Sequence, residues 1–529
     1  MPSLVDPSTT TIDFASEAAA NPRPTVGFVS LGCPKNLVDS EVMMGLLQQA
    51  GGELTPHAED ADILVVNTCS FIDSAKEESV NTILEMVQHK ATNGGRARKL
   101  IVAGCLVERY REEIRKNIPE VDAVVGTGEL EAILGAAGLQ PAPAPVQLAS
   151  PFNILVSRAP SAVHQHSHPT ELGAQRQTET LTSRPEGDLR ERQGRFSRAA
   201  WDGASATLPD YLYSDDTPRI LTTPRASAYI KIAEGCDHPC SFCIIPQLRG
   251  KFRSRRLESI VAEAEKLVAQ GVREITLIGQ DTTCYGEDLG LKDGLAALLD
   301  ALAVLPGLKW LRFLYAYPNK ITTRLLETIA RHDNIAKYLD VPLQHASPAV
   351  LKRMKRGGTP DVFLRLIEKA RATVPDIVIR TSFIVGFPGE TEDDFKELLD
   401  FVKRAQIDWL GVFSYSDEEG AAAFDLDAEL KVPKRTIESR RRRLMKLQQK
   451  ISAKSKAAWV GRELDVLVEG ESEETELLWE GRTLLHAPEI DGKVFLNDFG
   501  PHEILVPGTF YRAEITESHD YDVVARILQ

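Results

Sequence analysis

Short apolar strands alternate with amphipathic helices along two stretches of the chain, and no other sequence feature restricts the fold as strongly. The first stretch covers residues 25–128. Its expected strands are residues 26–31, 62–67, 99–103 and 121–125, and its expected helices are residues 37–49, 74–87 and 108–116. Because strands that alternate with helices pair in parallel, this stretch predicts a doubly wound α/β sheet.

The second stretch begins near residue 228. Its expected strands are residues 229–233, 274–279, 310–315, 338–343, 378–385 and 411–415, and its expected helices include residues 257–269, 322–331, 362–372 and 392–404. Six strand–helix units are too few for a closed eight-stranded barrel, so the pattern predicts an open, partial (βα)6 barrel. A long basic helix is expected over residues 434–459. Short strands separated by turns such as Asp491-Gly492 then predict a small β-barrel.

These patterns divide the 529-residue chain into five segments. The segments are a disordered leader (1–24), an N-terminal domain (25–140), a linker or insertion (141–217), a central barrel domain (218–459) and a C-terminal β-barrel (460–529). The insertion is rich in Pro, Ser, Arg, Gln and His and has no periodicity, which predicts that it is mostly disordered.

The composition excludes several classes of protein. A net charge of -14 argues against a protein that binds nucleic acid over its whole surface. No stretch approaches the roughly 18 consecutive apolar residues of a membrane span, so we expect no membrane association. The leader lacks the basic start and apolar core of a secretory signal. Seven cysteines, an odd number, do not suggest a disulfide framework, and we expect a cytoplasmic protein.

The most specific chemical signal is a C-x3-C-x2-C motif formed by Cys236, Cys240 and Cys243. Three thiolates at this spacing can hold three irons of a four-iron cluster and leave the fourth iron open to a reacting ligand. The alternative is a zinc site, but zinc prefers four ligands. His238, inside the motif, is the one nearby candidate for the fourth.

Three further cysteines share one topological position in the first stretch. Cys33, Cys69 and Cys105 each follow the carboxyl end of an expected strand. Ligands of open α/β sheets bind outside those strand ends, so three thiols from successive strands can converge there although they are far apart in sequence. Each could also be an ordinary buried cysteine. Their shared position favours a second three-thiolate cluster site.

These motifs carry a family resemblance. The C-x3-C-x2-C motif resembles that of the radical S-adenosylmethionine (SAM) enzymes. The full arrangement of domains resembles the methylthiotransferases of that superfamily, whose C-terminal barrel is of the TRAM type. Four segments are similar to the RimO branch of the family: Leu-Gly-Cys-Pro-Lys-Asn (31–36), Ala-Glu-Gly-Cys-Asp-His-Pro-Cys-Ser-Phe-Cys (233–243), Val-Pro-Leu-Gln-His-Ala-Ser (341–347) and Gly-Phe-Pro-Gly-Glu-Thr (386–391).

The resemblance implies an enzyme that inserts sulfur and a methyl group at the β-carbon of an aspartate of ribosomal protein uS12. It implies two [4Fe-4S] clusters, one held by Cys33, Cys69 and Cys105 and the other by Cys236, Cys240 and Cys243. SAM would bind at the second cluster, serving as radical source and methyl donor. A small electron-donor protein is the implied reductant. The long insertion departs from the family pattern and leaves the relative placement of the first two domains open.

Weaker signals lie at the expected barrel rim and on the basic helix. Gln280 and Glu390 follow two expected strands and are interpreted as SAM contacts, although turn formation would explain the glycines beside them. Cys284 lies near the same rim, matches no cluster position and is interpreted as a bystander thiol. The run Arg440–Arg443 is interpreted as a solvated helix face, with contact to ribosomal RNA as the alternative.

Two other functions remain open at this point. A tRNA methylthiotransferase would perform the same chemistry on a nucleobase, and the small β-barrel, a type common among nucleic-acid binders, favours it. A non-catalytic iron–sulfur electron carrier or scaffold would need no open iron. Residues 461–529 contain five basic and sixteen acidic residues, a net charge of −11, which favours a basic protein partner over RNA.

Overall fold

The computed structural model describes residues 23–141, 209–224, 226–472, 475 and 477–528. Most of the predicted leader and most of the predicted insertion therefore lie outside the described residues. Residues 209–217, the end of that insertion, are packed against the central domain. Tyr213 is buried and donates a hydrogen bond to Glu263 at 3.3 Å, and Arg255 lies over its ring. The disorder predicted for these nine positions is wrong, because Tyr213 packs against Glu263 and Arg255 of the central domain.

The N-terminal domain is a five-stranded parallel sheet covered by helices on both faces, as the alternation predicted. The strand order is β2-β1-β3-β4-β5. The strands are β1 (Thr25–Ser30), β2 (Glu53–Thr55), β3 (Ile63–Thr68), β4 (Lys99–Gly104) and β5 (Ala123–Val125), and the helices are α1 (Pro34–Gln49), α2 (Asp73–Val87), α3 (Cys105–Asn117) and α4 (Ala132–Ala137). The sequence analysis missed β2 and α4 because both are short.

The central domain carries six parallel strands in two three-stranded sheets, β10-β9-β6 and β11-β12-β13. A parallel bridge between Leu311 and Ile335 joins the two sheets, so the six strands form the expected partial barrel. The strands are β6 (Ser227–Lys231), β9 (Glu274–Ile278), β10 (Trp310–Phe313), β11 (Tyr338–Asp340), β12 (Val378–Val385) and β13 (Trp409–Ser414). Strand β11 is three residues shorter than expected.

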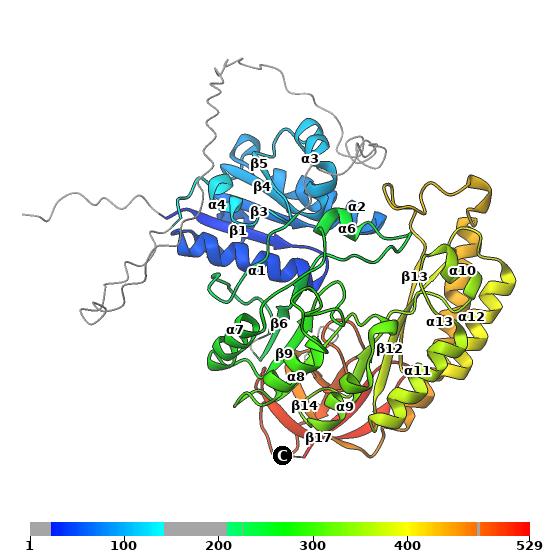
Figure 1. The fold of residues 1–529 in the computed structure, drawn as a ribbon. Helices are drawn as coiled ribbons and strands as arrows, with labels where there is room; N and C mark the ends of the chain where they lie inside the picture. The colour runs from blue at the N-terminus through cyan, green and yellow to red at the C-terminus, as the bar shows by residue number, and fades with distance from the viewer. Residues whose placement is uncertain (1–22, 142–208, 225, 473–474, 476, 529) are drawn as a thin grey trace, which may run out of the picture.

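Helices cover the outer face of the partial barrel (Figure 1). They are α7 (Leu257–Ala269), α8 (Gly294–Ala303), α9 (Thr323–Arg331), α10 (Pro348–Arg353), α11 (Pro360–Thr373), α12 (Glu392–Ala405) and α13 (Lys434–Ala457), whereas the short helix α6 (Ile245–Arg249) lies against α3 of the N-terminal domain. Threonine side chains cap the N-termini of three of these helices. The hydroxyls of Thr322, Thr359 and Thr391 each accept a backbone N–H of the first turn. Thr391 also forms a reciprocal capping box with Asp394.

The C-terminal domain is a closed five-stranded barrel, as predicted. Its strands are β14 (Glu463–Glu471), β15 (Trp479–Thr483), β16 (Val494–Asp498), β17 (Phe510–Ser518) and β18 (Val523–Ile527). It packs against the amino-terminal halves of the central strands. Arg482 pairs with Glu274 at the start of β9, and Tyr338 at the start of β11 donates to Asp491 at 2.6 Å. Asp491 is thus a buried domain contact as well as part of a turn.

The N-terminal domain contacts the opposite side of the central domain, above β6 (Figure 1). Helix α1 lies against the chain segment that follows the insertion. Glu41 of α1 binds Arg219 at 2.6 Å and accepts the Thr222 N–H at 2.7 Å. Arg109 of α3 binds Glu418 at 2.7 Å. All these carboxylates are buried, so the placement of the two domains is fixed by paired charges.

Substitution of Gly45, on the face of α1 that meets this segment, tests the domain contact. A β-carbon at Gly45 would lie 2.4 Å from the carbonyl of Pro218. Gly45→Ala should therefore lower the free energy of unfolding by about 1–3 kcal/mol, as overpacking does. Gly135→Ala in α4 is the control, because nothing lies within 4 Å of its β-carbon, and it should raise stability by about 1 kcal/mol at most. Denaturant midpoints of both variants provide the measurement, and equal midpoints would contradict the contact.

Candidate functional site

The three N-terminal cysteines lie at the carboxyl edge of three adjacent strands. Cys33 caps α1 after β1, Cys69 follows β3, and Cys105 begins α3 after β4. Gly32 lets the first two approach, since a β-carbon there would lie 3.0 Å from the Cys69 sulfur. Gly104, at φ +92°, likewise leaves room for Asn67. The sequence analysis expected this convergence, and the structure brings the three side chains to one edge.

Buried polar side chains fix the backbone around these cysteines. Ser79 accepts the Cys69 N–H at 3.0 Å and donates to its carbonyl at 2.8 Å. Ser70 donates to the Cys105 carbonyl at 3.0 Å. Asn67 donates to the Asn36 carbonyl at 2.9 Å, which ties β3 to the start of α1. The cysteines therefore stand on a rigid edge, as a preorganised ligand set requires.

The central motif lies in the loop between β7 (Ala233–Glu234) and α6. Strand β7 pairs with β8 (Arg253–Ser254), a two-residue ribbon that the sequence analysis missed. The loop is closed by hydrogen bonds from the Cys236 N–H to the Gly250 carbonyl at 3.2 Å and from the Ser241 hydroxyl to the Arg353 carbonyl at 2.8 Å. The motif thus lies at the carboxyl end of the first barrel strand, facing the N-terminal domain.

The two cysteine triads are Cys33, Cys69 and Cys105 in the N-terminal domain and Cys236, Cys240 and Cys243 in the central motif. The thiols of both triads suit the positively charged irons of an iron–sulfur cluster. Burial, with a smaller contribution from the neighbouring Cys69 and Cys33 and against the opposing charge of Arg249, raises the pKa of Cys105 to about 12. Burial likewise raises the pKa of Cys243 to about 12, with a further contribution from Cys240. Thiols that resist ionisation in this way become thiolates only against strong positive charge, which cluster irons supply.

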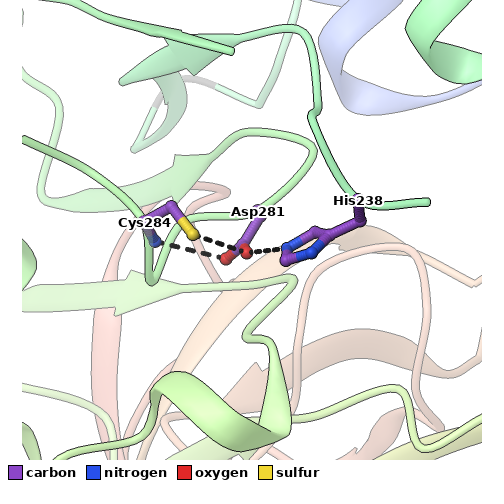
Figure 2. A group of neighbouring side chains, drawn as sticks. All are labelled: His238, Asp281 and Cys284. Carbon is purple, nitrogen blue, oxygen red and sulfur yellow. Dashed lines mark hydrogen bonds and ion pairs between the residues drawn. The ribbon is translucent and has the colours of Figure 1, made fainter. Parts of the chain in front are cut away.

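His238 does not complete a four-ligand zinc site with the motif cysteines. Its Nε2 lies 2.6 Å from the carboxylate of Asp281, and its ring stacks on Tyr317 with centroids 3.8 Å apart. Figure 2 shows His238, Asp281 and Cys284 joined through the Asp281 carboxylate. Asp281 also accepts the Thr283 hydroxyl and the Cys284 thiol. We interpret the group as an anchor for the motif loop, and the bystander role of Cys284 stays a prediction.

Gln280 and Glu390 both lie at the barrel rim and are held by internal contacts. Gln280 donates to Glu234 at 2.6 Å. Glu390 is 4% exposed, accepts the Gly386 N–H and forms an ion pair with Arg440 at 3.2 Å. Their role as SAM contacts stays a prediction. Arg440 itself is buried, so the interpretation of the whole Arg440–Arg443 run as a solvated face is wrong at its first residue, because the helix turns it toward a buried carboxylate.

A buried charge network that the sequence pattern did not predict joins the N-terminal cysteines to the central domain. Arg249, at the end of α6, donates to Asp39 at 2.6 Å and to Asn36 at 3.2 Å, both on α1. Its Nη2 lies 3.5 Å from the Cys105 sulfur. Lys231 of β6 contacts Asp39 and, at 2.5 Å, Glu234. Arg356 makes the matching contact at the other triad, 3.6 Å from the Cys240 sulfur.

A cavity of about 420 Å³ lies beside Cys33, where all three domains meet. Its walls come from the N-terminal sheet and α1, from the segment before β6, and from the C-terminal barrel. The lining residues are Phe28, Ser30, Gly32, Cys33, Pro34, Leu37, Met44, Thr222, Thr223, Pro224 and Glu489. No described helix is long and apolar enough to span a membrane.

Sequence comparisons cover all three domains. Residues 25–126 match the uncharacterized protein family UPF0004, residues 230–402 match the radical SAM superfamily, and residues 460–528 match the TRAM domain. A Koribacter versatilis protein named ribosomal protein uS12 methylthiotransferase RimO is 68% identical over 95% of this chain and 96% of its own length. A protein of that name from Solibacter usitatus is 55% identical over 95% of this chain and 94% of its own length. Another, from Pelotomaculum thermopropionicum, is 43% identical over 94% of this chain and 98% of its own length.

Removal of the Arg249 charge tests whether the network holds the domains together. Arg249→Met would leave Asp39 and Glu234 with Lys231 as their single buried cation. Breaking a buried pair in this way should lower the free energy of unfolding by about 3 kcal/mol or more. Arg256→Met, at the exposed N-terminus of α7, should change it by less than about 0.5 kcal/mol. Denaturant unfolding of the apo proteins measures both, and similar midpoints would show that the network does not hold the interface.

Proposed function

This chain belongs to the RimO family of ribosomal protein uS12 methylthiotransferases, and from that membership we propose that it inserts sulfur and a methyl group at the β-carbon of an aspartate of uS12. The observation that carries the proposal is the presence of two cysteine triads on two domains that share a buried interface, where Arg249 of the central domain lies 3.5 Å from the Cys105 sulfur. Relatives of that name match more than nine tenths of the chain, which supports this function over an electron carrier.

We assign one [4Fe-4S] cluster to Cys33, Cys69 and Cys105 and a second to Cys236, Cys240 and Cys243, with SAM at the second. When bound, these cofactors supply the one-electron chemistry, sulfur and methyl group that side chains cannot provide near pH 7. Gln280 and Glu390 remain our proposed SAM contacts, Gln280 by its amide and Glu390 by shaping the turn at Gly386.

The protein's own part in the reaction is to orient and to shield. The cysteine loops are held by buried serines and by ordered backbone contacts. Arg249 and Arg356 each direct a guanidinium at one thiol of a triad, and the charge of Arg249 acts on the pKa of the Cys105 thiol in the direction that favours the thiolate, against the effect of burial. The paired side chains of the interface are themselves almost fully buried. These features hold reacting groups in register, which is the main contribution a protein makes to cofactor chemistry.

The C-terminal barrel supports a basic protein as substrate. Its net charge of −11 would repel an RNA backbone and attract a ribosomal protein. This argues against the tRNA methylthiotransferase, although TRAM domains suggest an RNA contact. We therefore propose that any contact with ribosomal RNA involves Arg442 and Arg443, which are exposed on α13. A small electron-donor protein completes the reaction, which takes place where ribosomes are assembled, in the cytoplasm.

Separate removal of the two triads tests the function. Anaerobically reconstituted wild-type protein should hold about eight irons, four for each cluster. Replacing Cys236, Cys240 and Cys243 by Ala should remove roughly half the iron and all cleavage of SAM to 5′-deoxyadenosine. Replacing Cys33, Cys69 and Cys105 by Ala should remove the other half of the iron and preserve that cleavage. Neither variant should modify uS12. A wild-type protein that saturates near four irons would refute the two-cluster assignment.

Charge reversal on the C-terminal barrel tests the encounter with uS12. Glu469 and Glu480 are unsuitable because Arg482 and Lys493 bind them. Glu503 and Glu517 are exposed, and Glu503→Lys with Glu517→Lys should lower the association rate about 3- to 10-fold at low salt, since steering by charge sets that rate.

The matched control for the barrel variant reverses two exposed acids on the helices of the central domain. Glu368→Lys with Glu397→Lys makes the same change in net charge on α11 and α12. Stopped-flow binding should show little effect of the control, and the effect of the barrel variant should fade as salt is raised. Equal rate losses in the two double variants would show that only net charge matters.

A further inference from the structure

The ammonium group of Lys35 crosses from the N-terminal domain to the central domain. Lys35 stands two residues after Cys33 in the first turn of α1, and its Nζ lies 3.3 Å from the ring centroid of Tyr315. The side chain is partly buried. Within the described residues, no carboxylate lies within 4.0 Å of this ammonium group. The aromatic face is therefore its principal partner, and an anion could still bind it.

Three other cations of this interface differ from Lys35 because each pairs with a carboxylate. Lys231 and Arg249 share Asp39, and Arg219 binds Glu41. A charge withdrawn from water is costly unless it is paired. Natural interfaces keep such a charge where a ligand supplies the partner, as binding sites for carboxylates and phosphates do.

Tyr315 is held in a strained conformation at the carboxyl rim of the barrel. It lies two residues past the end of β10 with φ +66°, a left-handed value that is rare for a residue with a large side chain. The Tyr315 N–H donates to the Asp340 carboxylate at 2.8 Å, and the Tyr315 carbonyl accepts the Thr282 N–H at 3.2 Å. In this backbone conformation the Tyr315 ring lies against the ammonium group of Lys35. Residues in such conformations cluster at active sites.

The segment that carries Tyr315 also touches the other triad. Tyr317 stacks on His238, inside the C-x3-C-x2-C loop, and the Arg356 guanidinium lies over the Tyr317 ring, 4.3 Å from its centroid. Lys35 therefore lies at the contact between the two cysteine-bearing rims, adjacent in sequence to the Cys33 cavity walls. A substrate carbon that must be reached from both triads would be placed close to this ammonium group.

We propose that Lys35 binds the side-chain carboxylate of the substrate aspartate and so selects aspartate over uncharged side chains. This inference rests on the proposed function, because it takes the uS12 aspartate as substrate. The carbon to be modified is bonded to that carboxylate. An ion pair to Lys35 would fix this carbon between the triads, and the cavity of about 420 Å³ beside Cys33 gives room for neighbouring residues of the substrate.

The test compares two substrates and three enzymes. The substrates are uS12 and uS12 in which the modified aspartate, located by mass analysis, is replaced by asparagine. The enzymes are wild type, Lys35→Gln and the control Lys403→Gln, whose lysine is 58% exposed on α12. Both substrates present the same β-carbon, so a difference between them measures recognition of the carboxylate charge.

Wild type should prefer the aspartate substrate by about 10- to 100-fold in kcat/KM, the range expected for one charge-assisted hydrogen bond. Lys35→Gln should lose that preference by lowering its activity on the aspartate substrate, and Lys403→Gln should keep it. The dissociation constants of the two substrates, measured without reductant, should change in the same direction. Iron content and substrate-free cleavage of SAM should be the same in all three enzymes.

Lys35→Arg separates recognition from a structural role. This variant keeps the charge and should retain most of the preference for aspartate. If Lys35→Gln still discriminates as wild type does, or if it loses iron and stability, Lys35 serves only the domain contact and the proposal is overturned. If wild type neither binds nor modifies uS12, the proposed function falls together with this inference, whereas normal modification by wild type isolates the question of Lys35.

Discussion

The charge network around Arg249 is the interaction on which the rest of the structure depends. One guanidinium contacts Asp39 and Asn36 of the N-terminal domain, approaches the Cys105 sulfur and lies 3.4 Å from Glu234 of the central domain. Buried ion pairs add little net stability compared with apolar contacts. They do specify how the two domains are placed, because a shift of one domain against the other would leave a buried charge unpaired. The network therefore fixes where the two triads lie relative to each other, and proximity of the triads is what the chemistry requires.

The C-terminal barrel extends the same principle to the other end of the central domain. Arg482 reaches Glu274 at the start of β9, and Arg380 of β12 lies 3.6 Å from Asp491. A partial barrel of six strands leaves its inner face open, and the flanking domains cover it with paired charges and apolar side chains. The chain thus behaves as one assembly, in which the acidic outer barrel can meet a basic substrate while the cysteine-bearing rims stay enclosed.

The sequence predicted what depends on local pattern and failed where distant residues decide. Hydrophobic periodicity gave the order of the strands and helices, and the strand-end positions of Cys33, Cys69 and Cys105 gave their common edge. The two partners of Arg249 on α1, Asp39 and Asn36, lie 210 and 213 residues away in the chain, so no window of sequence could reveal them. Arg440 looked solvated within a basic run because its partner, Glu390, is on another element. Tyr213 looked disordered because its binding surface is formed by α7.

The assignment of uS12, rather than tRNA, as the substrate is tested most directly by offering the reconstituted enzyme both substrates at once. Purified uS12 and bulk tRNA would be incubated together, anaerobically, with SAM, a sulfide source and a chemical reductant, and the masses of the protein and of the nucleosides would then be measured. If uS12 is the substrate, one aspartate of uS12 should gain a methylthio group in place of a hydrogen, and no nucleoside should change. A methylthiolated nucleoside with unmodified uS12 would contradict the assignment.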